Sequence, residues 1–168
     1  MRRKPACGLR QDQRGTSLLE LSLVAPFLFV LALGIFEFGN VLYSYHLIST
    51  GVHDAARYLA RFDHSVAISI SKETEAVQLA LTGSINGGTP RVAGWDETHL
   101  TVDYDPPAGI PNPVDPVSGE RPYRGGDTIW IVRVSTDVST GGFGNLSFLG
   151  LGSTIDFNLS HAERQIGE

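Results

Sequence analysis

A single carboxylate, Glu20, lies inside an apolar run that begins just after Gly15. It is the only charged residue between Thr16 and Phe36. A carboxylate inside a bilayer costs about 2.5–3.5 kcal/mol on insertion scales, so it requires compensation. Cleavage of the chain after Gly15 would provide it, because the new α-amino group at Thr16 would lie one helical turn from Glu20. In an assembly, the amine of a neighbouring subunit could serve instead.

A less specific interpretation of Glu20 stays open. The residue is only five positions from Gly15, where the basic leader ends, so its carboxylate could reach the polar surface of a membrane. An acid near the N-terminus of a helix is also favoured by the helix dipole.

The apolar run has the length of a membrane-spanning helix. Its 21 residues from Thr16 to Phe36 would rise roughly 30 Å at ~1.5 Å per residue, which matches the hydrocarbon core of a bilayer. A secretory signal has a shorter apolar region of about 7–15 residues, followed by a cleavage site. We therefore expect a transmembrane helix over residues 16–39 and an extramembrane continuation of the same helix over residues 40–62.

Further positions along this helix have residue types with specific consequences. Pro26 removes one backbone hydrogen bond and is expected to kink the helix. Gly34 and Gly39 would allow another helix to approach closely. Glu37 marks the outer end of the span, where it either faces water or pairs with a partner subunit.

Charge is distributed unevenly along the chain. Residues 1–15 carry five basic side chains and one acidic side chain, whereas the rest of the chain carries 8 basic and 17 acidic side chains. The positive-inside rule places the basic leader in the cytoplasm and the domain after the span on the opposite side of the membrane. Because that domain is acidic, no nucleic-acid partner is expected. Cys7 is the only cysteine, so no internal disulfide can form.

Residues 63–168 are expected to form a soluble domain. A short helix is predicted over residues 71–81, with Ser71 as N-cap and Gly83 as stop. Alternating or β-branched residues predict strands over 99–104, 128–137 and 154–162. The predicted fold class is α+β, with the long N-terminal helix packed on a small antiparallel sheet. The helix face expected against this sheet carries Leu47, Val52, Ala55, Ala56, Leu59 and Phe62.

Two segments between the predicted strands differ in composition. Residues 105–127 contain six prolines and are expected to form an irregular exposed loop. Residues 139–153 are rich in glycine but also carry five large apolar side chains. These side chains either fold back over the sheet or touch the membrane or another subunit.

Residues that could carry catalysis or hold a metal are scattered. No nucleophile–base pair or nucleotide-binding motif occurs, so we expect no enzyme activity, no cofactor and no metal site. His46 and His53 share a helical face, but no third ligand is near them in the sequence. A calcium site built from Asp103, Asp105, Asp115 and Asp127 is a weaker possibility than a solvated acidic loop.

Several short motifs together resemble the TadE-like family. They are Arg14-Gly15, Glu20 within the apolar run, Leu23–Phe27 with its proline, Glu37-Phe38-Gly39, and Ala55-Ala56-Arg57. This pattern covers residues 14–61 in detail and extends more loosely to the C-terminal strands. It is also similar to the wider class of type IV pilin-like proteins.

The resemblance implies a pseudopilin or minor pilin of a bacterial tight-adherence (Flp-type) pilus. In that class a membrane-embedded prepilin peptidase cuts after the glycine, here Gly15, and leaves Thr16 as the new N-terminus. The glutamate, here Glu20, then guides packing of the apolar helix. The implied partners are other pilins and pseudopilins, an inner-membrane assembly platform, the peptidase and the lipid bilayer.

Location and role follow from the same features. We expect a single-pass protein of the bacterial inner membrane, with a cytoplasmic N-terminus and a periplasmic C-terminal domain. Two alternatives stay open. One is a membrane-anchored periplasmic binding domain that never enters a pilus, and the other is an anchored periplasmic enzyme.

Overall fold

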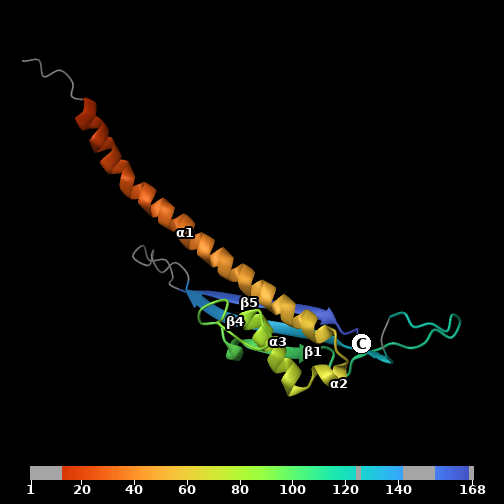
Figure 1. Ribbon diagram of the computed structural model, residues 1–168. Helices are drawn as coiled ribbons and strands as arrows, with labels where there is room; N and C mark the ends of the chain where they lie inside the picture. Colours follow the sequence, from red (N-terminus) through yellow and green to blue (C-terminus); the bar gives the residue numbers. More distant parts are fainter. Residues whose placement is uncertain (1–12, 124–125, 142–153, 167–168) are drawn as a thin grey trace, which may run out of the picture.

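The computed structural model describes residues 13–123, 126–141 and 154–166. The predictions for leader residues 1–12, including Cys7, therefore lie outside the described residues. The same holds for the predicted packing of the apolar side chains within residues 142–153. What the structure describes is one long helix with a small α+β domain around its C-terminal half (Figure 1).

The long helix, α1, spans Gln13–Ala60 and contains 48 residues. Its sequence is rich in leucine and alanine, and Pro26 is the only proline within it. The helix was expected to continue to Phe62, but it ends two residues earlier. The chain turns there because the Phe62 N–H bonds to the Leu59 carbonyl, while the Ala60 carbonyl accepts the Ile166 N–H at 2.9 Å.

Two further helices follow α1. Helix α2 spans His64–Ala67 and helix α3 spans Ile70–Thr82. Ser71 was predicted as the N-cap of α3, but the N-cap is Ser69. Ser69 has extended backbone angles, and its carbonyl accepts the first helical hydrogen bonds. The predicted stop is confirmed, since Gly83 adopts a left-handed conformation with φ of 81°.

The main sheet has three antiparallel strands in the order β1–β4–β5. Strand β1 spans Leu100–Tyr104 directly after a short 3-10 helix, η1, at Glu97–His99. Strand β4 spans Ile131–Gly141 and pairs along its whole length with β5, Thr154–Arg164. The predicted α+β arrangement of a long helix on a small antiparallel sheet is thereby confirmed.

A second sheet of two strands differs from the sequence prediction in two respects. Strand β2, Ile110–Pro111, lies inside the segment predicted to be irregular and pairs with β3, Thr128–Ile129. The strand predicted over 128–137 is therefore split at Trp130. The pairing of β3 with β2 rather than β1 causes the split, because β1 pairs only with residues 132–136 of β4.

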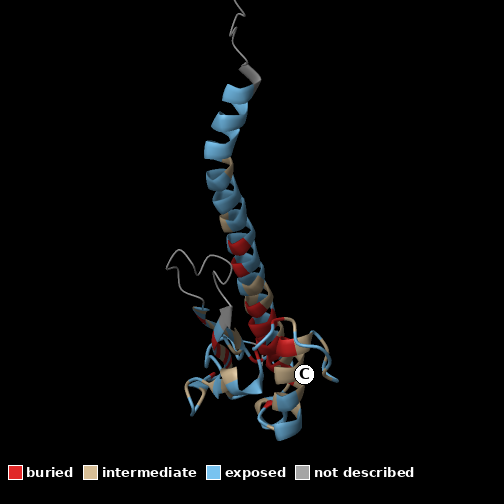
Figure 2. Cartoon of the chain, turned by 90° about the vertical axis from the view of Figure 1, so that its left-hand side faces the viewer, coloured by how far each residue is buried: buried red, intermediate tan, exposed pale blue. Residues whose placement is uncertain are grey.

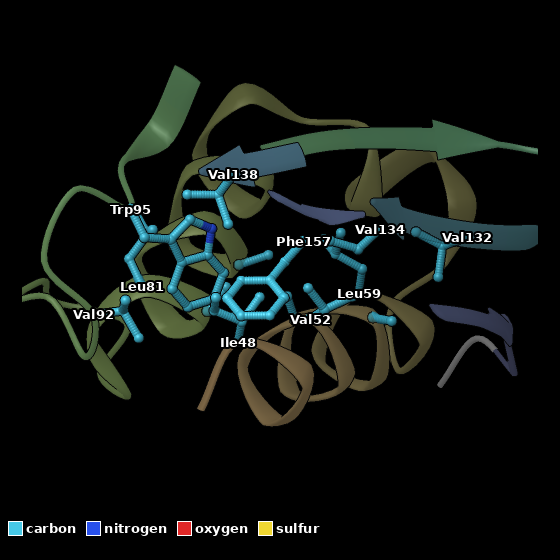
Figure 3. Close-up of a cluster of buried hydrophobic side chains, with 14 of the residues drawn as sticks. Ile48, Val52, Leu59, Leu81, Val92, Trp95, Val132, Val134, Val138 and Phe157 are labelled. Atoms are coloured by element: carbon cyan, nitrogen blue, oxygen red, sulfur yellow. The ribbon is translucent and has the colours of Figure 1, made fainter. Parts of the chain in front are cut away.

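The hydrophobic core lies between the C-terminal half of α1, α3 and the main sheet. Figure 3 shows Ile48, Val52 and Leu59 of α1 facing Val134 and Phe157 of the sheet. Trp95 closes one end of this core, and its Nε1–H donates to Thr136 Oγ1 at 3.0 Å. The predicted apolar face of α1 is confirmed, with Leu47 and Phe62 partly buried, and Ile48 is a fully buried member that the prediction omitted.

Candidate functional site

The N-terminal half of α1 projects away from the folded domain with its apolar side chains exposed. Figure 2 shows that the upper part of α1 is exposed, whereas much of its lower part is buried. Leu19, Phe27 and Phe36 are 72%, 74% and 79% exposed, and none of the most apolar 18-residue window is buried. The mean hydropathy of that window is 2.4, so the helix is long and apolar enough to cross a membrane. This half-helix is the candidate functional site.

Gly15 and Thr16, the predicted processing site, lie in the first turn of α1 and are exposed. A side chain added at Gly15 would meet no atom within 4 Å. Packing among the residues that the structure describes therefore gives no reason for glycine at this position.

Glu20 is exposed one turn after Thr16, at the spacing that the sequence predicted. No hydrogen bond or ion pair joins it to another of the residues that the structure describes. Its neighbours Leu19, Leu21 and Leu23 are also exposed. The carboxylate is therefore available to a group from outside the folded domain.

Pro26 lies inside α1, and the helix continues through it without a break (Figure 1). Since proline has no N–H, the carbonyl of Ser22 loses its usual helical donor at this point. Gly39, further along, is exposed and would accept a Cβ without contact, so another helix could approach it closely.

Glu37 differs from the other polar residues of the exposed half. Its side chain is only 6% exposed and it takes part in a polar interaction. The interpretation of Glu37 as an acid facing water is therefore wrong. Its pairing with a partner subunit stays a prediction.

The second half of α1 explains the Ala55-Ala56-Arg57 motif. Both alanines are completely buried against the core, and Arg57 is exposed. Small side chains at these positions allow α1 to lie close to α3 and the sheet. Gly51 has the same role, which the sequence prediction missed. A Cβ at Gly51 would lie 2.5 Å from the Ala80 carbonyl oxygen and 2.6 Å from the Trp95 ring.

A polar cluster of Tyr58, Lys72 and Glu75 joins α1 to α3. Lys72 Nζ lies 2.6 Å from Glu75 Oε2, and the Tyr58 hydroxyl donates to the same carboxylate oxygen. These two hydrogen bonds, that from Lys72 above all, lower the pKa of Glu75. The same carboxylate raises the pKa of Lys72. The cluster therefore holds α1 and α3 together with a charged carboxylate at its centre.

Three of the four aspartates considered as a less favoured calcium site have other partners. Asp105 pairs with Arg133 at 3.0 Å, and Asp127 pairs with Arg121. Asp115 accepts the N–H groups of Val117 and Ser118 in a turn, which lowers its pKa. Within the described ranges, these carboxylates do not gather around one point.

His46 and His53, considered together in the sequence, are both exposed on α1. The structure brings His53, and not His46, next to two residues of β5, His161 and Glu163. No sequence signal predicts this grouping, because it depends on how β5 packs against α1.

Comparison with known families gives a match to part of the chain. Residues 15–57 match the family model described as TadE-like protein, which confirms the resemblance inferred from the sequence. The matched range begins at Gly15, covers the exposed half of α1 and ends at Arg57. No curated protein and no solved structure matches the chain. A TadE-like segment on an N-terminal apolar helix fits a protein associated with a tight-adherence (Tad) pilus.

Proposed function

We propose that this chain, which carries a TadE-like segment at residues 15–57, is a minor pilin or pseudopilin of a tight-adherence pilus or a related secretion apparatus. One N-terminal helix would hold it in the bacterial inner membrane. The leader would remain in the cytoplasm and the α+β domain would lie in the periplasm, as the basic leader favours.

The observation that carries this proposal is the division of α1 into two halves. The second half is part of the core of the folded domain, while the first half exposes leucine and phenylalanine on all sides. Such a surface requires lipid or other apolar helices around it. Because lipid tails and leucine side chains are similarly apolar, the same helix could exchange lipid for neighbouring pilin helices.

Glu20 supplies specificity that an apolar surface lacks. A carboxylate among exposed leucines is costly in lipid, and an amine from a neighbouring subunit would offset that cost. Removal of residues 1–15 creates such an amine at Thr16 of each subunit. The pairing would favour one axial position of each helix relative to the next, so the charge would set the register of assembly.

The role proposed here is non-catalytic. The partners would be other pilins and pseudopilins, an inner-membrane assembly platform and a prepilin peptidase. Gly15 and Thr16 would form the peptidase site, and Glu20, Pro26 and Glu37 would contribute to helix packing. The binding-domain alternative shares the membrane helix but has no need for the processing step.

Mass spectrometry of the protein purified from its native host tests the proposal. We expect an N-terminus at Thr16, and we expect the protein in the sheared pilus fraction or in a complex with pilus components. A chain that retains Met1 and occurs only in the membrane fraction would favour the binding-domain alternative.

A further inference from the structure

Three potential metal ligands meet where α1 packs on β5. His53 of α1, with His161 and Glu163 of β5, offers one ligand atom each, and these atoms all lie within 4.8 Å of one another. His161 Nε2 lies 2.9 Å from Glu163 Oε1. The imidazole rings of His53 and His161 are stacked, with centroids 3.4 Å apart. It is the one such group among residues 13–123, 126–141 and 154–166.

The alternation of β5 explains why these residues meet. Phe157, Leu159, His161 and Glu163 point to the same face of the strand, because side chains alternate with a period of two. Phe157 and Leu159 contribute to the core against α1. The two polar residues continue that face beyond the core, where α1 presents the exposed His53.

We propose that His53, His161 and Glu163 bind Zn²⁺ or a similar divalent transition-metal ion. Two imidazoles and one carboxylate are a common zinc ligand set, with water in the fourth tetrahedral position. Ca²⁺ and Mg²⁺ prefer oxygen ligands, so the two imidazoles favour a transition metal. The site is independent of the proposed pilus function.

Nearby positive charge narrows the choice of ion further. Arg57, Arg61 and Arg164 line one pocket together with Glu163. Their charges oppose a cation that is held only by electrostatic attraction. Affinity must therefore come from coordination by the imidazole nitrogens, which neutral histidines provide.

Binding requires a small rearrangement. Stacked rings direct their nitrogen lone pairs in similar directions, so one ring must rotate for both nitrogens to reach a single ion. His53 is exposed and can rotate without disturbing the core. The ion would replace the hydrogen bond between His161 and Glu163, and it would tie α1 to β5.

Titration of the tag-free full-length chain in detergent with Zn²⁺ tests this site. We expect one equivalent to bind in calorimetry and to raise the thermal unfolding midpoint. The variants His53→Gln, His161→Gln and Glu163→Gln should each lose roughly tenfold or more in affinity. Co²⁺ in place of Zn²⁺ should give the visible absorption of a four-coordinate ion. His46→Gln is the matched control, because His46 is exposed on the same helix two turns earlier, and it should bind as the native chain does.

Three outcomes would overturn the proposal of a metal site. They are no stoichiometric Zn²⁺ binding by the native chain, unchanged affinity in His53→Gln, and an equal loss in His46→Gln. His53→Gln keeps the test decisive if the β5 variants fail to fold, since the exposed His53 is not part of the core.

Discussion

Gly15 and Glu20 lie on the part of α1 that extends away from the folded domain. Both positions are exposed, and neither touches the described residues of that domain. Because no contact among the described residues requires these residue types, a group outside the chain is the simplest explanation for them. For Gly15 we infer a peptidase, and for Glu20 an amine of the assembled fibre. Because neither residue supports the fold, substitutions there can be interpreted without the complication of misfolding.

Gly15→Glu is expected to block removal of the first fifteen residues. A large charged side chain should exclude the scissile bond from the peptidase, while the fold is preserved because the position is open to solvent. The intact mass of the membrane-bound protein measures the result. Gly39→Ala, at another open helical glycine, should be processed normally. A chain beginning at Thr16 in the Gly15→Glu strain would contradict the assigned cleavage site.

Glu20→Ala is expected to leave membrane insertion intact and to abolish incorporation into the fibre. Insertion becomes more favourable by at most about 2.5–3.5 kcal/mol, the cost of a charge at the centre of the span, but the partner of the neighbouring amine is lost. Quantitative immunoblots of membrane and sheared pilus fractions measure both effects. Leu21→Ala removes an exposed neighbour without changing charge and should assemble. Normal piliation with Glu20→Ala would remove the role given to this carboxylate.

At the scale of the elements, the interface between α1 and α3 requires the two helix backbones to lie close together. Gly51 lies where the Ala80 backbone and the Trp95 ring press against α1. The Tyr58–Lys72–Glu75 cluster holds the same two helices further along. Apolar contact and charge thus act at different points of one interface, and each can be tested separately.

Gly51→Ala is expected to destabilise the domain by about 1–3 kcal/mol. The added methyl group would overlap backbone and ring atoms that cannot move without disturbing the core. In an open helical position the same substitution stabilises by up to about 1 kcal/mol. Urea unfolding of Gly51→Ala and Gly39→Ala in detergent should therefore give shifts of opposite sign. Equal shifts would show that the packing around Gly51 is looser than described.

Acid should weaken the α1–α3 joint through Glu75. Its pKa is lowered in the folded state by Lys72 and Tyr58, so its contribution is complete above the ordinary pKa of 4.5. That contribution disappears as the pH falls below 4.5 through the lower folded pKa. Thermal unfolding midpoints at pH 7 and at pH 3 should differ less in Glu75→Gln than in the native chain. Lys72→Met, which removes the main cause of the shift, should have the same effect. An unchanged pH dependence in both variants would exclude this cluster as a source.

At the scale of the whole molecule, one continuous helix serves two environments. Its first half has the surface of a membrane helix, and its second half has the packing of a soluble core. Continuity of the backbone means that any movement of the first half from lipid into a fibre carries the α+β domain with it. The domain would then reach the fibre surface in an orientation set by α1.

A chain that begins at Asn40 is expected to be soluble without detergent and to unfold cooperatively. The first buried apolar residue of the core, Val41, is retained, and the exposed apolar run is removed. Size-exclusion chromatography and circular dichroism in aqueous buffer measure this. The same chain should be absent from pili. Aggregation would mean that the folded domain itself requires the removed half.

Much of the fold could be predicted because it depends on local properties of the chain. The length of the apolar run, the turn at Gly83 and the alternation of Ile155, Phe157 and Leu159 follow from hydropathy and backbone preference. The spacing of Gly15 and Glu20 could be predicted for the same reason, because it is a local property of the helix. A helix keeps such spacing in any tertiary context.

Other features could not be predicted, because they depend on contacts between distant parts of the chain. The need for glycine at position 51 and the split of the strand at Trp130 both depend on neighbours far away in sequence. The grouping of His53 with His161 is the clearest case, since 107 intervening residues separate them. Pairing register and helix packing bring such residues together, and neither quantity is encoded in the spacing of residues along one segment.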